Sequence, residues 1–186
     1  MKFNLKIAPN SCRLILQLGI VWILLSIVRI LFYASNKGSF VHVYFSDFLF
    51  GAWFDLITIA LCFLPFVVLS LLPDSIFPPA IKKRVPQAYY HLTAILLYAV
   101  NILDIEYFKY TAKRSTIDLF TVLGAGSDFK QLITTFISDF WLLILLLFIL
   151  SAIHFFSNRL LRLKFPFEAT NTLRKSALNY LLFIPV

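Results

Sequence analysis

Long apolar runs recur along the chain and are separated by short polar segments. The hydrocarbon core of a bilayer is about 30 Å thick and needs roughly 20 apolar residues in a helix. Four runs are complete by this measure, and they cover residues 14–33, 48–72, 89–107 and 140–156. A fifth run occupies residues 177–186, and its ten residues would rise about 15 Å, half of a bilayer. The pattern predicts an all-α polytopic membrane helix bundle with four full spans and the first half of a fifth.

The stretch between the third and fourth runs has the pattern of helices that lie on a membrane surface. Ser115 precedes an acid at the third helical position, Asp118, so a first helix is expected over about 115–123. A second helix is expected over about 128–139, with its apolar residues at helical spacing on one face. Such amphipathic helices lie in the interface of the bilayer, here on the outer side. The alternative is a tilted extension of the fourth span.

The composition is typical of a membrane protein. Only 14% of the residues are charged and 60% are hydrophobic, whereas soluble domains have about 25% charged residues. The net charge of +8 does not indicate nucleic-acid binding, because the cations stand in short clusters between apolar runs and not on one face. Cys12 and Cys62 lie next to or inside apolar runs and have no CxxC spacing, so we expect neither a disulfide nor a redox role.

The distribution of Lys and Arg predicts the orientation. Short cytoplasmic loops are rich in these residues, and with a cytoplasmic N-terminus the inner segments hold eleven cations against five in the outer segments. We therefore expect the N-terminus in the cytoplasm and residue 186 heading outward. The first run contains Arg29 and lacks a good small-residue cleavage site, so we expect it to stay as an anchor. The inner cations are Lys2, Lys6, Arg13, Lys82, Lys83, Arg84, Arg159, Arg162, Lys164, Arg174 and Lys175.

Charges within the spans are candidate functional residues, because they are costly in lipid and usually face the protein interior. Arg29 lies about one turn from the outer end of the first span, and Asp55 lies some two turns inside the second. A structural ion pair between them is favoured over a proton relay. Asn101 and Asp104 are three residues apart on the third span and share a face with Phe108, so they present a polar stripe to a neighbouring helix near the outer surface.

A basic and aromatic belt follows the third span. Lys109, Lys113 and Arg114 alternate with aromatic residues, which suits phosphate head groups, although an ordinary interfacial anchor is favoured from composition alone. The histidines stand on different elements and on both sides of the membrane, so no metal site is expected. No Gly-rich phosphate loop, nucleophile elbow or pair of catalytic carboxylates is found in the polar stretches, so no catalytic residue is assigned.

Three sequence segments resemble a known family. They are NILDIEYFKYTAKRSTIDLF at 101–120, GAWFDL at 51–56 and DFW at 139–141. Together they are similar to the N-terminal membrane domain of the lipoteichoic acid synthase-like proteins, which belong to the alkaline phosphatase and sulfatase superfamily. The resemblance implies five spans followed by an extracytoplasmic catalytic domain, in the cytoplasmic membrane of a bacterium. The charged positions of this chain that match the family motifs are Arg29, Asp55, Asp104, Lys113, Arg114 and Asp118.

The resemblance implies a function for the chain. We expect an integral membrane domain of a transferase that moves phosphoglycerol or phosphoethanolamine from phospholipid at the outer face of the membrane, with membrane lipids as partners. The half-length fifth run predicts that the chain stops before the enzyme domain, where the family's catalytic threonine and divalent-metal ligands lie. No cofactor is therefore expected in this chain. The alternative is a self-standing membrane scaffold or assembly subunit, and a small transporter is disfavoured because no internal repeat is found.

Overall fold

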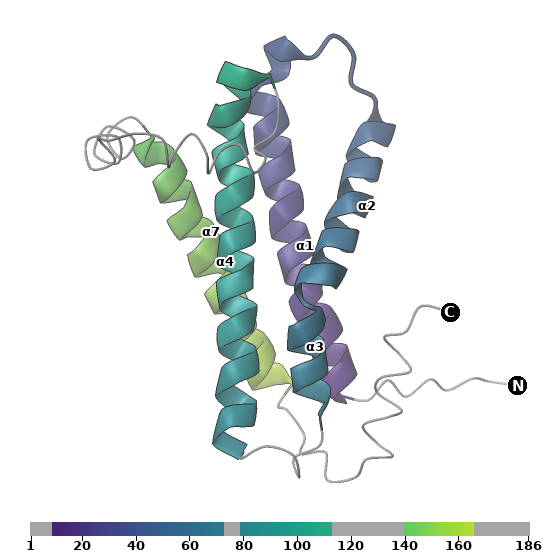
Figure 1. The fold of residues 1–186 in the computed structure, drawn as a ribbon, viewed down its shortest axis with the longest axis vertical. Helices are drawn as coiled ribbons and strands as arrows, with labels where there is room; N and C mark the ends of the chain where they lie inside the picture. Colours follow the sequence, from purple (N-terminus) through teal and green to yellow (C-terminus); the bar gives the residue numbers. More distant parts are fainter. Residues whose placement is uncertain (1–8, 73–78, 113–139, 166–186) are drawn as a thin grey trace, which may run out of the picture.

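The computed structural model describes residues 9–72, 79–112 and 140–165, and this part of the chain is helical apart from short turns (Figure 1). The prediction of an all-α chain is confirmed for these residues. The elements are α1 (Pro9–Ser35), the short 3-10 helix η1 (Lys37–Ser39), α2 (Phe45–Cys62), α3 (Leu64–Leu71), α4 (Pro79–Thr111) and α7 (Trp141–Lys164).

Four helices are long and apolar enough to cross a membrane, as the apolar runs predicted. They are Ser11–Ser35, Phe45–Cys62, Arg84–Lys109 and Trp141–Lys164. The expected half span at 177–186 and the expected interfacial helices at 115–123 and 128–139 lie outside the described residues. The described residues thus have the architecture of a multi-pass membrane protein.

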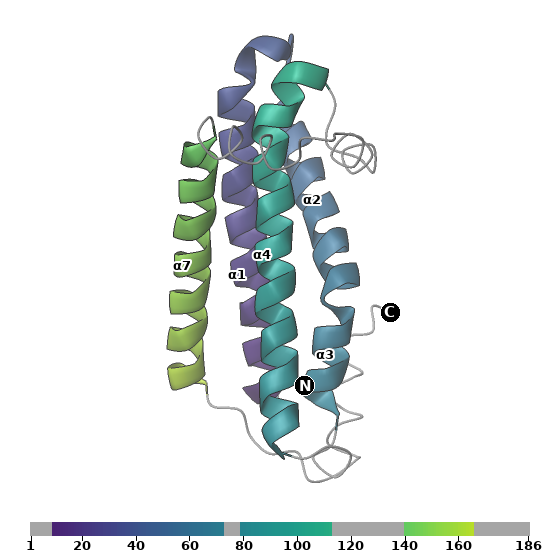
Figure 2. The same ribbon diagram turned by 60° about the vertical axis from the view of Figure 1, so that its left-hand side comes forward.

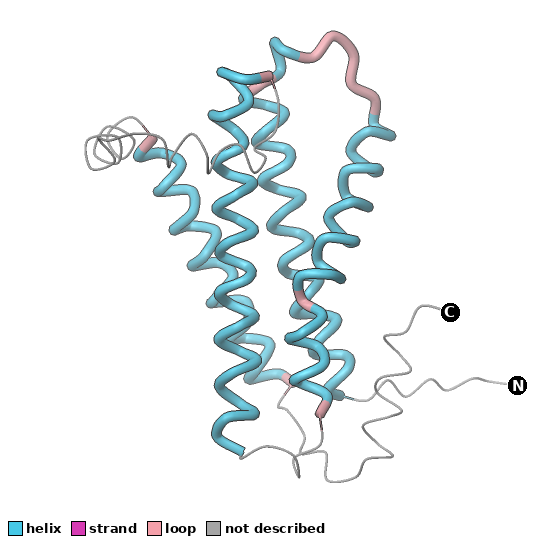
Figure 3. Tube along the Cα trace, in the orientation of Figure 1, coloured by secondary structure: helices cyan, strands magenta, loops and turns pink. Residues whose placement is uncertain are grey.

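The second span is not the single helix over 48–72 that the sequence predicted. It divides into α2 and α3 at Phe63, and Figure 3 shows the break between them. Pro65 lies in the first turn of α3 and has no backbone N–H to donate to the preceding turn. The interruption of the helix therefore has a local cause.

Two helices, α4 and α7, extend beyond their apolar runs. α4 has 33 residues and a length of about 50 Å, so it exceeds the thickness of the hydrocarbon core. α7 continues past the predicted end at residue 156 by two turns, and these turns carry Arg159, Arg162 and Lys164. Basic residues that follow the apolar part of a helix are typical of the point where a spanning helix leaves the hydrocarbon.

The helices form one bundle in which α1 and α4 are central (Figures 1 and 2). α7 packs on α1 and α4, α3 packs on α4, and α2 packs mainly on α1. We call the end where α1 and α4 begin and α7 ends the first end. The end where α1 and α4 end and where α2 and α7 begin is the second end. In Figure 1 these are the lower and the upper end, respectively.

Aromatic clusters close the bundle near both ends. Near the first end Phe63 and Phe66 pack on Tyr90, with ring centroids 5.6 and 4.9 Å from it. Near the second end Phe108 packs between the rings of Phe32 and Phe40, at 5.1 and 5.4 Å. Aromatic pairs of this kind add specific contacts to the apolar core.

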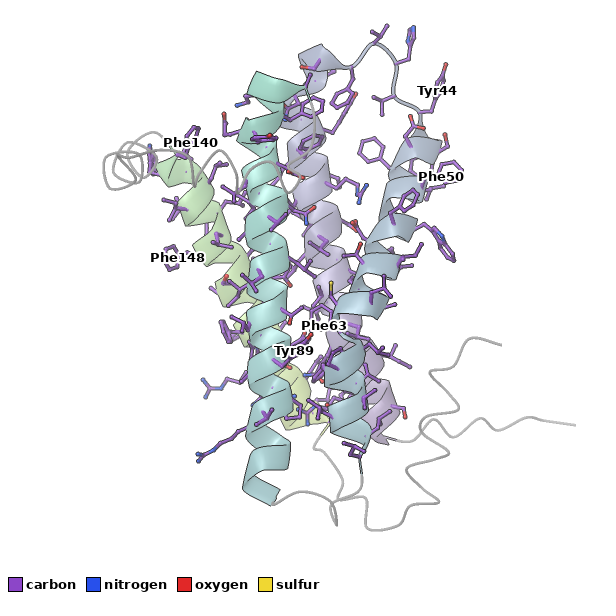
Figure 4. The ribbon with its side chains drawn as sticks, viewed as in Figure 1. Tyr44, Phe50, Phe63, Tyr89, Phe140 and Phe148 are labelled. Atoms are coloured by element: carbon purple, nitrogen blue, oxygen red, sulfur yellow. The ribbon has the colours of Figure 1, made fainter. Side chains whose placement is uncertain are left out.

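The outer surface of the spans is apolar. Figure 4 shows Phe50 and Phe148 pointing away from the bundle, and both side chains are well exposed. A patch of exposed apolar side chains that surrounds a helix bundle is unfavourable in water and is typical of a surface covered by lipid.

Candidate functional site: a charged pocket between α1, α2 and α4

The site begins with an ion pair between α1 and α2. Nη2 of Arg29 lies 2.5 Å from Oδ1 of Asp55, and Nε of Arg29 donates to Oδ2 at 3.2 Å. The two side chains are only 17% and 11% exposed. Both carboxylate oxygens are therefore engaged in the two-pronged geometry that gives strong pairs. The ion pair expected from the sequence is present.

A glycine allows the guanidinium to reach this place. A Cβ atom at Gly51 would lie 1.7 Å from Nη1 of Arg29, so the guanidinium rests directly on the backbone of α2. One residue further along, the carbonyl oxygen of Ala52 accepts a hydrogen bond from Nε1 of Trp22 at 3.0 Å. Gly51, Ala52 and Asp55 thus form one stripe of α2 that faces α1. This stripe explains why the segment GAWFDL has a glycine at 51 and an aspartate at 55.

Next to the ion pair lies a pocket of about 380 Å³. Its walls come from three helices, and because α2 packs mainly on α1, the space between α2 and α4 is not filled by a close helix contact. The lining residues are Leu25, Arg29, Phe54, Asp55, Thr58, Leu97, Val100, Asn101 and Asp104. Five of the candidate residues predicted from the sequence lie in the described helices. Four of them line this pocket: Arg29, Asp55, Asn101 and Asp104.

The α4 wall of the pocket carries the predicted polar stripe. Asn101 donates from Nδ2 to the carbonyl oxygen of Leu97 at 2.9 Å, and Asp104 is buried one turn further on. The fifth position, Lys109, lies beyond the pocket and is paired with Glu106 at 2.6 Å. The predicted head-group residues Lys113 and Arg114, as well as Asp118, lie outside the described residues.

The pocket lies within the span and faces lipid. Asp55 stands ten residues after the start of α2 at Phe45, which corresponds to a depth of about 15 Å along the helix axis. Arg29 stands six residues before the end of α1, at about 9 Å. Two of its lining side chains, Phe54 and Val100, are 64% and 49% exposed. The lining therefore reaches the apolar outer surface of α2 and α4.

The structure also contains a buried polar network that the sequence analysis missed. His154 of α7 lies 3.0 Å through Nε2 from Nδ1 of His91 and 3.1 Å through Nδ1 from the hydroxyl of Tyr98. Nε2 of His91 lies 3.1 Å from Nδ2 of Asn158, whose Oδ1 accepts a hydrogen bond from Gln17 at 2.6 Å. The network joins α1, α4 and α7.

His91 and His154 stand on different helices, as the sequence shows, but the packing of α4 on α7 brings their side chains into contact. α4 and α7 run antiparallel, and this brings His91 and His154 to the same depth. A signal was available in the spacing, because His154 and Asn158 are four apart on α7 and share one face. In the described ranges no three side chains of His, Cys, Asp or Glu come together as metal ligands.

No family model, curated protein or solved structure matches the chain.

The chemistry of the pocket is therefore the main guide to its role. A fixed ion pair, a buried carboxyl and an amide line a cavity that borders on lipid. Polar and ionisable groups are expensive at such a depth, and where they line a cavity they indicate a functional site. The histidine network, in contrast, joins side chains of α1, α4 and α7 to one another and is suited to fixing how three helices pack.

Proposed function

We propose that this chain is the membrane domain of a lipoteichoic acid synthase-like transferase. The enzyme would move phosphoglycerol or phosphoethanolamine from phospholipid at the outer face of the bacterial cytoplasmic membrane. The resemblance of the three sequence segments supports the reaction class, and two of these segments supply Asp55 and Asp104, which line the pocket. The pocket is the observation that carries the proposal, because a lipid that diffuses in the bilayer plane can reach it from the side.

The orientation in this proposal follows the cations of the described helices. The first end carries Arg159, Arg162 and Lys164 of α7, together with Arg13 of α1 and the Lys82–Arg84 cluster of α4. The second end carries fewer cations within the described ranges, Lys37 and Lys109. Cytoplasmic segments are the ones enriched in Lys and Arg. The first end is therefore assigned to the cytoplasm, and the pocket to the outer half of the bilayer.

The transfer itself is assigned to a domain outside this chain. The threonine that the resemblance implies would attack the phosphorus of the phospholipid, the bond between phosphorus and the diacylglycerol oxygen would break, and that oxygen would take up the proton of the threonine hydroxyl. An acceptor hydroxyl would then displace the threonine from phosphorus and return a proton to it. The family implied by the resemblance holds a divalent metal for this reaction, but the described residues offer no group of three ligands for one. The membrane domain holds lipid beside the outer interface.

Deletion of the complete gene that encodes the chain tests this function in cells. We expect the release of diacylglycerol from labelled phosphatidylglycerol and phosphatidylethanolamine to fall, and to return when the wild-type gene is restored. A gene carrying Arg29→Met should restore less than a matched Arg159→Met control when both proteins accumulate equally. Arg159 is the control because it is an exposed arginine near the end of α7, at the first end of the bundle, and does not line the pocket. Unchanged release in the deletion strain would contradict the proposal and favour a membrane scaffold.

A further inference from the structure

An arginine of α7 is fixed in place at the first end of the bundle. Nη2 of Arg162 donates to Oε1 of Gln87 on α4, and it lies 3.4 Å from Nε2 of His91. Oε1 of Gln87 also accepts from Nδ2 of Asn158 at 3.4 Å, and Asn158 is bound in turn by Gln17 of α1 in the buried network described above. The guanidinium of Arg162 therefore has a defined position, although the side chain is exposed.

The group that anchors Arg162 does not neutralise its charge. Gln87 is a neutral acceptor, and no carboxylate of the described residues pairs with Arg162. The sequence of α7 contains no Asp or Glu, and the first acid of α4 is Asp104, which lies toward the second end. Arg13 of α1 is close enough for its charge to repel that of Arg162. An anion from outside the bundle is therefore attracted to this place.

The anchored guanidinium keeps hydrogen-bond donors for such an anion. Arginine has five N–H donors, and the contacts of Arg162 with Gln87 and His91 use only Nη2. Nε and Nη1 make no hydrogen bond to the described residues, and because the side chain is exposed they can reach a ligand outside the bundle. The planar set of donors in a guanidinium matches the oxygens of a phosphate group.

Arg162 and Gln87 lie at the level of the lipid head groups. The spanning segment of α4 begins at Arg84, three residues before Gln87, and that of α7 ends at Lys164, two residues after Arg162. The phosphates of a bilayer lie just outside its hydrocarbon core. Beside Arg162 along α7, Leu163 exposes an apolar side chain that an acyl chain can cover. A phosphate that belongs to a lipid therefore reaches this place without leaving its leaflet.

We infer that Arg162, anchored by Gln87, binds the phosphodiester of an anionic phospholipid of the phosphatidylglycerol type in the leaflet at the first end. Basic sites between membrane-spanning helices are suited to anionic head groups. A zwitterionic head group is bound less well, because its ammonium or choline cation is repelled by Arg162 and Arg13. In the orientation proposed above this leaflet is the inner one. The site is separate from the pocket, which lies toward the second end.

Photo-crosslinking of the full chain in phosphatidylcholine nanodiscs tests the inference. Two probes, a phosphatidylglycerol and a phosphatidylcholine, carry the same diazirine in one acyl chain close to the ester. We expect the phosphatidylglycerol probe to label the peptides around Gln87 and Arg162 about tenfold more than the phosphatidylcholine probe, which corresponds to a preference of about 1.4 kcal/mol. Equal labelling of these peptides by the two probes would overturn the inference.

Three variants separate a built site from general attraction between lipid and surface charge. Arg162→Met should abolish most of the preference, whereas Arg159→Met, which removes an equal charge one turn earlier on the exposed surface of α7, should keep most of it. Gln87→Met leaves every charge in place but removes the acceptor that anchors Arg162, so the preference should fall about threefold. Equal losses in the two arginine variants, or an unchanged preference in a folded Gln87→Met protein, would overturn the inference. If Gln87→Met does not fold, the two arginine variants decide alone.

A competition experiment distinguishes a lipid phosphate from a water-soluble one. Glycerol 3-phosphate, which has the phosphate chemistry without the acyl chains, is added at millimolar concentration to the nanodiscs with the phosphatidylglycerol probe. Labelling around Gln87 and Arg162 should persist, because the lipid is held at this level by the bilayer. Loss of this labelling would show that the arginine binds a soluble phosphate ester and would overturn the assignment to lipid.

Discussion

Separating Arg29 from Asp55 should destabilise the bundle more than replacing both. The perturbation is a double-mutant cycle of Arg29→Met, Asp55→Leu and the combined variant. Both side chains are less than one-fifth exposed, and both oxygens of Asp55 contact the guanidinium. Removal of one partner leaves the other charge buried, and breaking such a pair costs about 3–5 kcal/mol. The polar pocket beside the pair reduces the cost of leaving one charge without its partner. We therefore expect the lower value, about 3 kcal/mol, for each single substitution.

The combined variant should be close to the wild type. Replacement of a buried ion pair by apolar residues of similar volume is often neutral or stabilising. The loss in the double variant should therefore be smaller than in either single variant, and the coupling free energy should be several kcal/mol. The exposed pair of Lys109 and Glu106 provides a matched control, for which helix-surface pairs give about 0.3–0.5 kcal/mol.

The assay is reversible unfolding in mixed micelles of mild detergent and dodecyl sulfate, followed by circular dichroism and tryptophan fluorescence. Trp22 is a useful local probe because it bonds to Ala52 at the same interface between α1 and α2. If the double variant loses as much free energy of unfolding as the two single variants together, the two charges are not coupled. That result would refute the reasoning that the pair is held in a low dielectric.

The remaining predictions concern the other polar contacts and the topology. His154→Phe leaves Tyr98 and His91 without a shared partner and should lower the free energy of unfolding by about 1–3 kcal/mol, whereas His42→Phe, on the exposed surface, should change it by less than about 0.5 kcal/mol. Gly51→Ala displaces the guanidinium of Arg29 and should cost about 1 kcal/mol in the same unfolding assay, whereas Gly19→Ala meets no neighbour within 4 Å and should be neutral or stabilising. In intact cells, on a background without Cys12 and Cys62, an impermeant thiol reagent should label Lys113→Cys but not Lys83→Cys, and the reverse pattern would contradict the orientation.

The four spans could be predicted from the sequence because hydropathy acts along the chain and needs no knowledge of tertiary contacts. The pairing of Arg29 with Asp55 could be inferred for a related reason. Each is a lone charge inside an apolar run, and a charge in lipid requires a partner. The division of the second span at Phe63 was also predictable, because Pro65 stands inside the run and cannot complete the helical hydrogen bonds.

The histidine network could not be found in the same way. His91 and His154 belong to helices separated by a long stretch of sequence, and their contact depends on how α4 packs on α7. The role of Gly51 was hidden for the same reason, since a glycine in an apolar run gives no sign of the arginine from α1 that rests on it. The pocket was only partly foreseen. Its polar residues could be named from the sequence, but the space they enclose results from α2 packing mainly on α1.

The most direct test of the central claim is the release of diacylglycerol by purified protein in liposomes. The complete product of the gene that encodes this chain should release diacylglycerol from phosphatidylglycerol or phosphatidylethanolamine in the presence of manganese, zinc or magnesium, and a chelator should stop it. Residues 1–186 alone should release none above a lipid-only control, because their polar stretches offer no nucleophile with a neighbouring base. Absence of release by the complete protein would contradict the account, and so would chelator-sensitive release by residues 1–186 alone.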